Sequence, residues 1–183
     1  MTHRILLVDD EPNVLAALER ALIDEPWEIF TAQSGEAGLE ALAERSFTVI
    51  VSDERMPGMG GAEFLSRARA LYPDTLRILL TGQASLESTM KAVNGGEIYR
   101  FFLKPWDEMT VVLALRSAVE KSELEEENRR LLRTVKRQSS ELKALEKSFP
   151  GISDLRKDDS GAYVLEEISD DEAAELIAKY GLP

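Results

Sequence analysis

The first 106 residues alternate between two kinds of segment, and this alternation limits the possible folds more than any other feature. Short apolar runs, often rich in β-branched residues, are separated by longer segments whose apolar residues recur at helical spacing. Strands that alternate with helices form a parallel sheet that is covered by helices on both faces. We expect five strands, at Arg4–Val8, Trp27–Thr31, Phe47–Ser52, Thr75–Leu80 and Ile98–Leu103.

Local signals indicate where several of the helices begin and end. Pro12 suits the first turn of a helix, and Ser34 and Ser85 are of the residue type that caps a helix N-terminus. Asn94-Gly95-Gly96 predicts the end of the fourth helix. The sequence therefore predicts a doubly wound α/β fold, in which ligands bind beyond the carboxyl ends of the strands.

Polar residues follow four of the expected strands at those carboxyl ends. They are Asp9, Asp10 and Glu11 after the first strand, Asp53 at the end of the third, Thr81 after the fourth and Lys104 after the fifth. Two like charges about 5 Å apart repel by roughly 3 kcal/mol at an effective dielectric constant of about 20. A divalent cation relieves this repulsion, and Mg²⁺ suits a site of few carboxylates, a backbone carbonyl and waters. Asp53 could then act as a nucleophile toward a phosphoryl group whose oxygens bind Thr81 and Lys104.

Each of these features has an ordinary structural explanation when it is taken alone. An Asp-Asp pair at a strand end usually caps a helix or lies in solvent, and a threonine that closes a strand reflects strand propensity. The glycines of Met56–Gly61 lack the Gly-Lys-Ser/Thr ending of a P-loop, so they more simply shape the turn after Asp53. Taken together and in this order, the residues predict a phosphoryl-acceptor site.

Four stretches that carry these residues resemble the receiver domains of bacterial two-component response regulators. They are Ile5–Glu11, Val49–Gly58, Leu79–Gly82 and Phe102–Trp106. The resemblance implies a flavodoxin-like (βα)₅ receiver with sheet order 2-1-3-4-5, which we place at residues 1–120. It also implies that a sensor histidine kinase transfers a phosphoryl group to Asp53, so that the protein is a phosphoryl acceptor and not an enzyme acting on small molecules.

The same resemblance assigns the expected metal ligands. Mg²⁺ would be held by Asp10 and Asp53, by Asp9 through a water molecule, and by the backbone carbonyl of Arg55. These are hard oxygen donors of the kind that Mg²⁺ prefers.

The resemblance further implies a switch. Thr81 would move toward the phosphoryl group while Phe101, which replaces the tyrosine common at this position, turns inward; Phe101 could equally be an ordinary core residue. The bond between Lys104 and Pro105 is expected to be a cis peptide, a form largely confined to proline. Glu54 and Gln83 flank the site and could tune dephosphorylation by controlling access of water.

Residues 107–149 contain no glycine or proline and predict a long extension of the fifth receiver helix. Apolar residues recur at alternating spacings of four and three, which is typical of a coiled coil. The seam consists of Leu124, Asn128, Leu131, Val135, Gln138, Leu142, Leu145 and Phe149. We expect a homodimer through residues 117–149, and Asn128 favours two parallel strands in register. Like charges at Glu120/Glu125 and Glu141/Glu146 oppose a parallel pair, so an antiparallel pair or packing on another protein stays open.

The last part of the chain, residues 150–183, predicts a small acidic unit. Pro150-Gly151 ends the long helix, and Asp158–Gly161 lies between two short runs that predict a β-hairpin. Ser169–Glu172 has the spacing of a capping box and predicts a final helix.

The charge distribution indicates which kind of molecule could receive the signal. The chain has a net charge of −12 and no cluster of basic residues, so no nucleic-acid partner is expected. With no cysteine and no long apolar run, we expect a cytoplasmic protein that neither spans nor binds a membrane. A metal-dependent HD-type hydrolase needs several histidines, and the sequence has only His3. An adaptor that signals to an unknown protein partner is therefore preferred, with a transcriptional regulator acting on DNA as the alternative.

Overall fold

The computed structural model describes residues 2–82, 98–148, 156–157 and 163–164. The chain divides into two compact units, Met1–Arg129 and Arg130–Pro183. The expected fourth helix, with its signals at Ser85 and 94–96, lies outside the described residues, as does the expected final helix.

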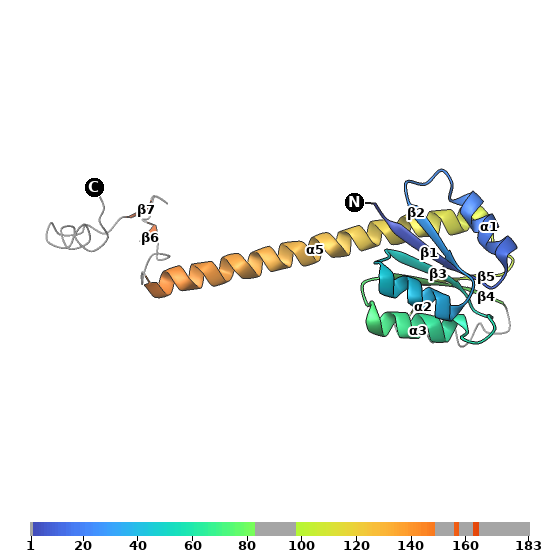
Figure 1. Ribbon diagram of the computed structural model, residues 1–183. Coiled ribbons are helices and arrows are strands. Elements are labelled where there is room, and N and C mark those ends of the chain that lie inside the picture. The colour runs from blue at the N-terminus through green and yellow to red at the C-terminus, as the bar shows by residue number, and fades with distance from the viewer. Residues whose placement is uncertain (1, 83–97, 149–155, 158–162, 165–183) are drawn as a thin grey trace. The chain divides into compact units, whose positions relative to one another are not determined.

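A five-stranded parallel sheet forms the centre of the first unit (Figure 1). Its order is β2-β1-β3-β4-β5, which confirms the predicted doubly wound fold. The strands are β1 (Arg4–Val8), β2 (Glu28–Ala32), β3 (Val49–Asp53), β4 (Leu76–Thr81) and β5 (Arg100–Leu103). The described helices are α1 (Pro12–Ala21), α2 (Gly35–Glu44), α3 (Gly61–Leu71) and α5 (Glu108–Ser148).

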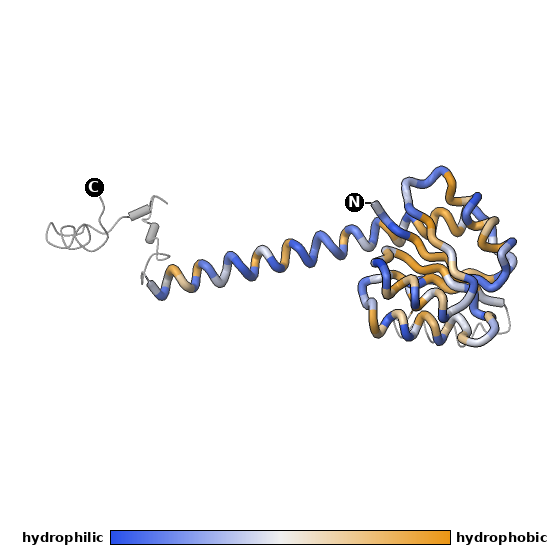
Figure 2. The backbone as a smooth tube through the Cα atoms, in the orientation of Figure 1, coloured by the Kyte–Doolittle hydropathy of each residue, from blue (hydrophilic) through white to orange (hydrophobic). Residues whose placement is uncertain are grey.

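Two apolar layers hold the helices against the sheet. Successive strand residues point to opposite faces, so Leu7 packs with Leu15 of α1 and Leu115 of α5, whereas Leu6 packs with Phe64 of α3. Figure 1 shows α2 and α3 together on one face of the sheet. In Figure 2 the sheet is the most continuously hydrophobic part of the described chain, as expected of strands buried on both faces.

The predicted helix signals agree with the structure where it describes them. The Ser34 hydroxyl accepts a hydrogen bond from the backbone N–H of Ala37 at 3.1 Å, and Pro12 is the first residue of α1. The start of α5 is capped by Asp107, whose carboxylate accepts the Thr110 N–H at 2.8 Å. These contacts supply partners for N–H groups that the first helical turn leaves unpaired.

Polar contacts attach the first part of α5 to the receiver fold. Arg116 pairs with Glu25 at 2.6 Å, and Arg129 pairs with Asp74 at 2.8 Å. Between them, His3 Nε2 lies 2.8 Å from Glu123 Oε1. The first compact unit runs through Arg129, and the receiver boundary at residue 120 stays a prediction.

The second unit contains the rest of α5 and two short strands. β6 (Arg156–Lys157) and β7 (Tyr163–Val164) pair antiparallel, as the predicted hairpin requires. The described part of the chain has no helix that is long and apolar enough to cross a membrane.

Candidate functional site

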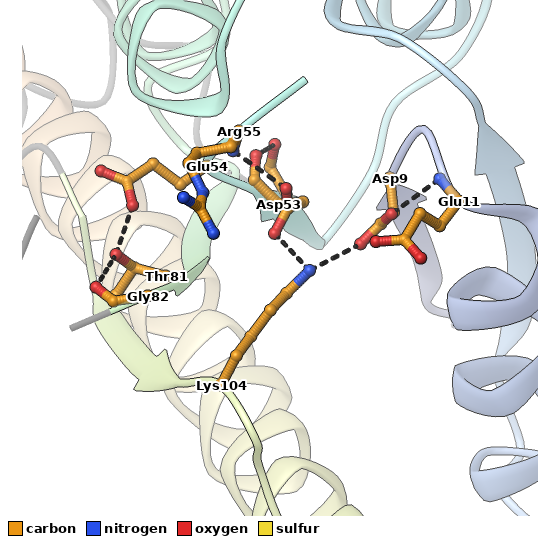
Figure 3. Close-up of polar contacts among 9 residues, drawn as sticks. Asp9, Glu11, Asp53, Glu54, Arg55, Thr81, Gly82 and Lys104 are labelled. Carbon is orange, nitrogen blue, oxygen red and sulfur yellow. Dashed lines mark hydrogen bonds and ion pairs between the residues drawn. The ribbon is translucent and has the colours of Figure 1, made fainter. Parts of the chain in front are cut away.

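The carboxyl ends of four neighbouring strands bring polar side chains to one edge of the sheet (Figure 3). Asp53 ends β3, Asp9 follows β1, and Lys104 follows β5. The Lys104 ammonium lies 2.6 Å from Asp53 Oδ1 and 3.3 Å from Asp9 Oδ2. Residues far apart in the sequence thus meet where the order of the strands predicted that they would.

The two aspartates are held by their own loops. Asp9 Oδ1 accepts the backbone N–H of Glu11 at 2.9 Å, and Asp53 Oδ2 accepts that of Arg55 at 2.9 Å. This bond from an Asp to the backbone two residues later is the usual way in which Asp shapes a turn. Both side chains are buried, with residue exposures of 1% for Asp9 and 6% for Asp53. Their carboxylates are consequently fixed in place and largely removed from water.

The loop after β3 returns so closely that only glycine fits at position 61. A Cβ atom on Gly61 would lie 1.9 Å from the backbone oxygen of Asp53. The Gly61 N–H also donates to the Glu54 oxygen at 2.9 Å. The glycines of Met56–Gly61 therefore shape the turn after Asp53, as the sequence predicted.

Lys104 is positioned by the end of β5 and by its neighbours. Its backbone N–H donates to the Thr81 oxygen at 2.8 Å, and its bond to Pro105 is cis, as predicted. The ring of Trp106 lies 5.3 Å from the Lys104 ammonium, within the range of a cation–π contact. The sequence analysis did not predict this contact between Trp106 and Lys104. The presence of an aromatic residue directly after Lys104-Pro105 could have indicated it.

The carboxylates and the ammonium shift one another's protonation. Burial raises the pKa of Asp9, and the Asp53 charge adds to this, while the Glu11 N–H and Lys104 oppose it. Burial acts to lower the pKa of Lys104, but hydrogen bonding and charge from Asp53, followed by those of Asp9, outweigh it and raise the pKa. Lys104 is therefore held as a cation that compensates the two carboxylates.

Thr81 and Glu54 form a second contact group beside the first. The Thr81 hydroxyl donates to Glu54 Oε2, and it also lies 3.1 Å from the backbone oxygen of Gly82. Figure 3 shows these residues on the opposite side of Asp53 from Asp9. Sequence reasoning named both residues but did not foresee their contact, because the rotamer of Glu54 is not encoded in strand periodicity.

Three further residues that the sequence predicted for the site differ in their burial. Asp10 is half-buried beside Asp9, and Arg55 is exposed, with its guanidinium 3.6 Å from where a Cβ atom on Gly82 would lie. Phe101 is half-buried and packs against the apolar layer of α2 and α3. Gln83 lies outside the described residues. The roles of these residues stay predictions.

The donor atoms at this edge suit a hard cation. Asp9 and Asp53 supply carboxylate oxygens, and the raised pKa of Lys104 keeps the nearby nitrogen from acting as a metal ligand. Oxygen donors of this kind favour Mg²⁺ over softer metals. Within the described residues, no three acidic or histidine side chains form a ready-made metal cluster. The residues thus fit Mg²⁺ chemically, and Asp9 and Asp53 would hold it.

Comparison with known proteins shows the family to which the chain belongs. The model of the response regulator receiver domain matches residues 5–116. The chain belongs to this family. The receiver match includes Asp9, Asp53, Thr81 and Lys104 and ends within α5.

Individual relatives agree with the receiver assignment. The hydrogenase transcriptional regulatory protein HoxA of Cupriavidus necator is 33% identical over 98% of this chain, which spans 38% of HoxA. A structure described as adenylate cyclase from Rhodopirellula baltica is 35% identical, with a TM-score of 0.70 over 73% of this chain and 98% of that one. The signal receiver domain of an HD domain-containing protein from Pseudomonas fluorescens Pf-5 is 40% identical, with a TM-score of 0.64 over 69% and 93%. The chain therefore spans little more than a third of HoxA but nearly all of the two structures.

Proposed function

We propose that this receiver accepts a phosphoryl group on Asp53 from a sensor histidine kinase, in a reaction that depends on Mg²⁺. The observation that carries the proposal is the distance of 2.6 Å between Lys104 and the Asp53 carboxylate, with Asp9 on the other side of the ammonium. This arrangement supplies a carboxylate nucleophile, a cation for a phosphoryl oxygen and acidic ligands for a metal.

In the proposed reaction, a carboxylate oxygen of Asp53 attacks the phosphorus atom of a phosphohistidine. The P–N bond breaks, its electron pair remains on the imidazole nitrogen, and an acyl phosphate forms on Asp53. When bound, Mg²⁺ would shield the negative charge of the donor and of the group in transfer. Lys104 then pairs with a phosphoryl oxygen in place of the carboxylate, and the Thr81 hydroxyl donates a hydrogen bond to another phosphoryl oxygen.

The Asp53→Asn variant tests this proposal. The wild-type protein should be labelled by acetyl phosphate in the presence of Mg²⁺ and should not be labelled in EDTA, as measured by intact-protein mass spectrometry. Asp53→Asn should remain folded but unlabelled. The control is Asp24→Asn, a change at an exposed loop residue, which should be labelled like the wild type. Labelling of Asp53→Asn at the wild-type rate would place the acceptor elsewhere.

We further propose that α5 passes the signal on as a coiled-coil homodimer. Its seam carries large apolar side chains that are more than half exposed, including Leu124, Leu131, Val135 and Leu142. Figure 2 shows hydrophobic residues recurring along α5 among hydrophilic ones. A second copy of the helix would cover this seam, and a protein partner would read the change in the dimer.

A second candidate is regulation of transcription, and the similarity to HoxA favours it. That similarity extends over 98% of this chain, well beyond the residues of the receiver match. Fluorescence anisotropy with duplex DNA at low salt separates the candidates. Salt-dependent binding by the phosphorylated protein would favour the second candidate, whereas no binding would favour the adaptor.

A further inference from the structure

The backbone of Glu54 is fixed on both sides, so its side chain has a defined starting direction. Its N–H donates to the Leu80 oxygen at 2.9 Å, and its oxygen accepts the Gly61 N–H at 2.9 Å. Position 61 cannot carry a side chain, because a Cβ atom there would collide with the Asp53 oxygen. Glu54 is thus held directly between the phosphoryl acceptor and the end of β4.

From this position, the Glu54 carboxylate accepts a hydrogen bond from the hydroxyl of Thr81. Thr81 is fully buried, so few partners are available to its hydroxyl. A hydrogen bond to an ionised carboxylate is stronger than one to a neutral acceptor such as a backbone carbonyl. The Thr81 hydroxyl therefore donates its hydrogen bond to Glu54, and Figure 3 shows this contact as separate from the group formed by Lys104 and the aspartates.

We infer that Glu54 is a positioning residue that competes with the phosphoryl group for the Thr81 hydroxyl. The inference deepens the proposed function and rests on it. A hydroxyl has one proton to donate, so Thr81 must leave Glu54 before it can bind an oxygen of the phosphoryl group on Asp53. Glu54 consequently stabilises the unphosphorylated arrangement and weakens the response to a phosphoryl group.

An incidental contact of a solvated glutamate is the ordinary alternative. It predicts that removing the Glu54 side chain changes the affinity for a phosphoryl group only through its charge, whatever residue stands at position 81. Competition for one proton predicts instead that the effect of Glu54 disappears when Thr81 has no hydroxyl. A double-mutant cycle separates the two explanations.

Binding of beryllofluoride in the presence of Mg²⁺ is the measurement, because this anion is tetrahedral like a phosphoryl group and attaches to a carboxylate. Isothermal titration should show that Glu54→Ala binds beryllofluoride about tenfold more tightly than the wild type. Glu54→Gln, which retains a neutral acceptor, should show a smaller gain. In the Thr81→Val background, Glu54→Ala should change the affinity by less than about twofold.

The control is Glu63→Ala, which removes an equal charge from an exposed ion pair with Arg67 on α3. It should leave the affinity unchanged, and thermal unfolding should show that all variants are folded. Equal or weaker binding by Glu54→Ala, or the same gain in the Thr81→Val background, would overturn the inference while leaving the proposed function intact. Absence of binding by the wild type, or equal binding by Asp53→Asn, would overturn the proposed function and the inference with it.

Discussion

Replacement of Lys104 by methionine should destabilise the protein by an amount that depends on pH. The ammonium lies 2.6 Å from Asp53 and 3.3 Å from Asp9, which corresponds to gross attractions of roughly 6 and 5 kcal/mol at an effective dielectric constant of about 20. Desolvation of the three charges offsets most of this. Breaking a buried pair costs about 3–5 kcal/mol and breaking an exposed pair about 0–1 kcal/mol. The Lys104 side chain is 28% exposed, so we expect a loss of about 2 kcal/mol.

The pH dependence follows from Asp9. Because its pKa is raised by burial, the folded protein binds more protons at this carboxyl than the unfolded chain does. Stability therefore falls as the pH rises from the ordinary Asp value through the raised one. The positive charge of Lys104 lowers the Asp9 pKa, so Lys104→Met should raise this pKa further. The variant should therefore lose more stability than the wild type between about pH 4 and pH 7.

Thermal unfolding in EDTA, followed by circular dichroism, measures both effects. A loss of about 2 kcal/mol corresponds to a fall of roughly 4–8 °C in Tm. Lys121→Met is the control, because the Lys121 side chain is 44% exposed and pairs with Glu125 within α5 at 2.6 Å. Added Mg²⁺ should recover most of the loss in Lys104→Met by compensating the two carboxylates. Equal losses in the two variants, or a difference that shrinks toward neutral pH, would refute the reasoning.

Two further predictions concern the metal and the seam. Asp9→Asn should raise the Tm of the metal-free protein at neutral pH, because it removes a carboxylate whose ionised form burial disfavours. The same change should weaken Mg²⁺ binding, as measured by calorimetry. A lower Tm together with an unchanged Mg²⁺ affinity would contradict this prediction. The double variant Leu131→Asp/Leu142→Asp should be a monomer when its mass is measured by light scattering, because both side chains lie on the seam. The control Ser140→Asp lies off the seam and should remain a dimer. Persistence of the dimer in the double variant would show that another surface drives association.

The fold and the placement of the site were predictable because both follow from periodicity. Short apolar runs between helical segments require a parallel sheet, and the carboxyl ends of its strands share an edge. Asp9, Asp53 and Lys104 therefore had to approach one another, and the structure places the ammonium between the two carboxylates.

Details that depend on side-chain packing were not predictable in the same way. Phe47 was expected to begin a strand, but β3 starts at Val49, and Phe47 packs edge-on against Phe30 at 5.4 Å between ring centres. An apolar residue just before a strand and one within it give the same pattern. The contact between Glu54 and Thr81 depends on a rotamer, which residue spacing does not determine.

The central claim is that position 53 carries the phosphoryl group, and reductive trapping tests it most directly. Borohydride reduces an aspartyl phosphate to homoserine, which peptide mass spectrometry locates in the chain. After incubation with acetyl phosphate and Mg²⁺, the account predicts homoserine at position 53 and at no other aspartate. Homoserine at Asp9 or Asp10, or none in a protein that has been labelled, would contradict it.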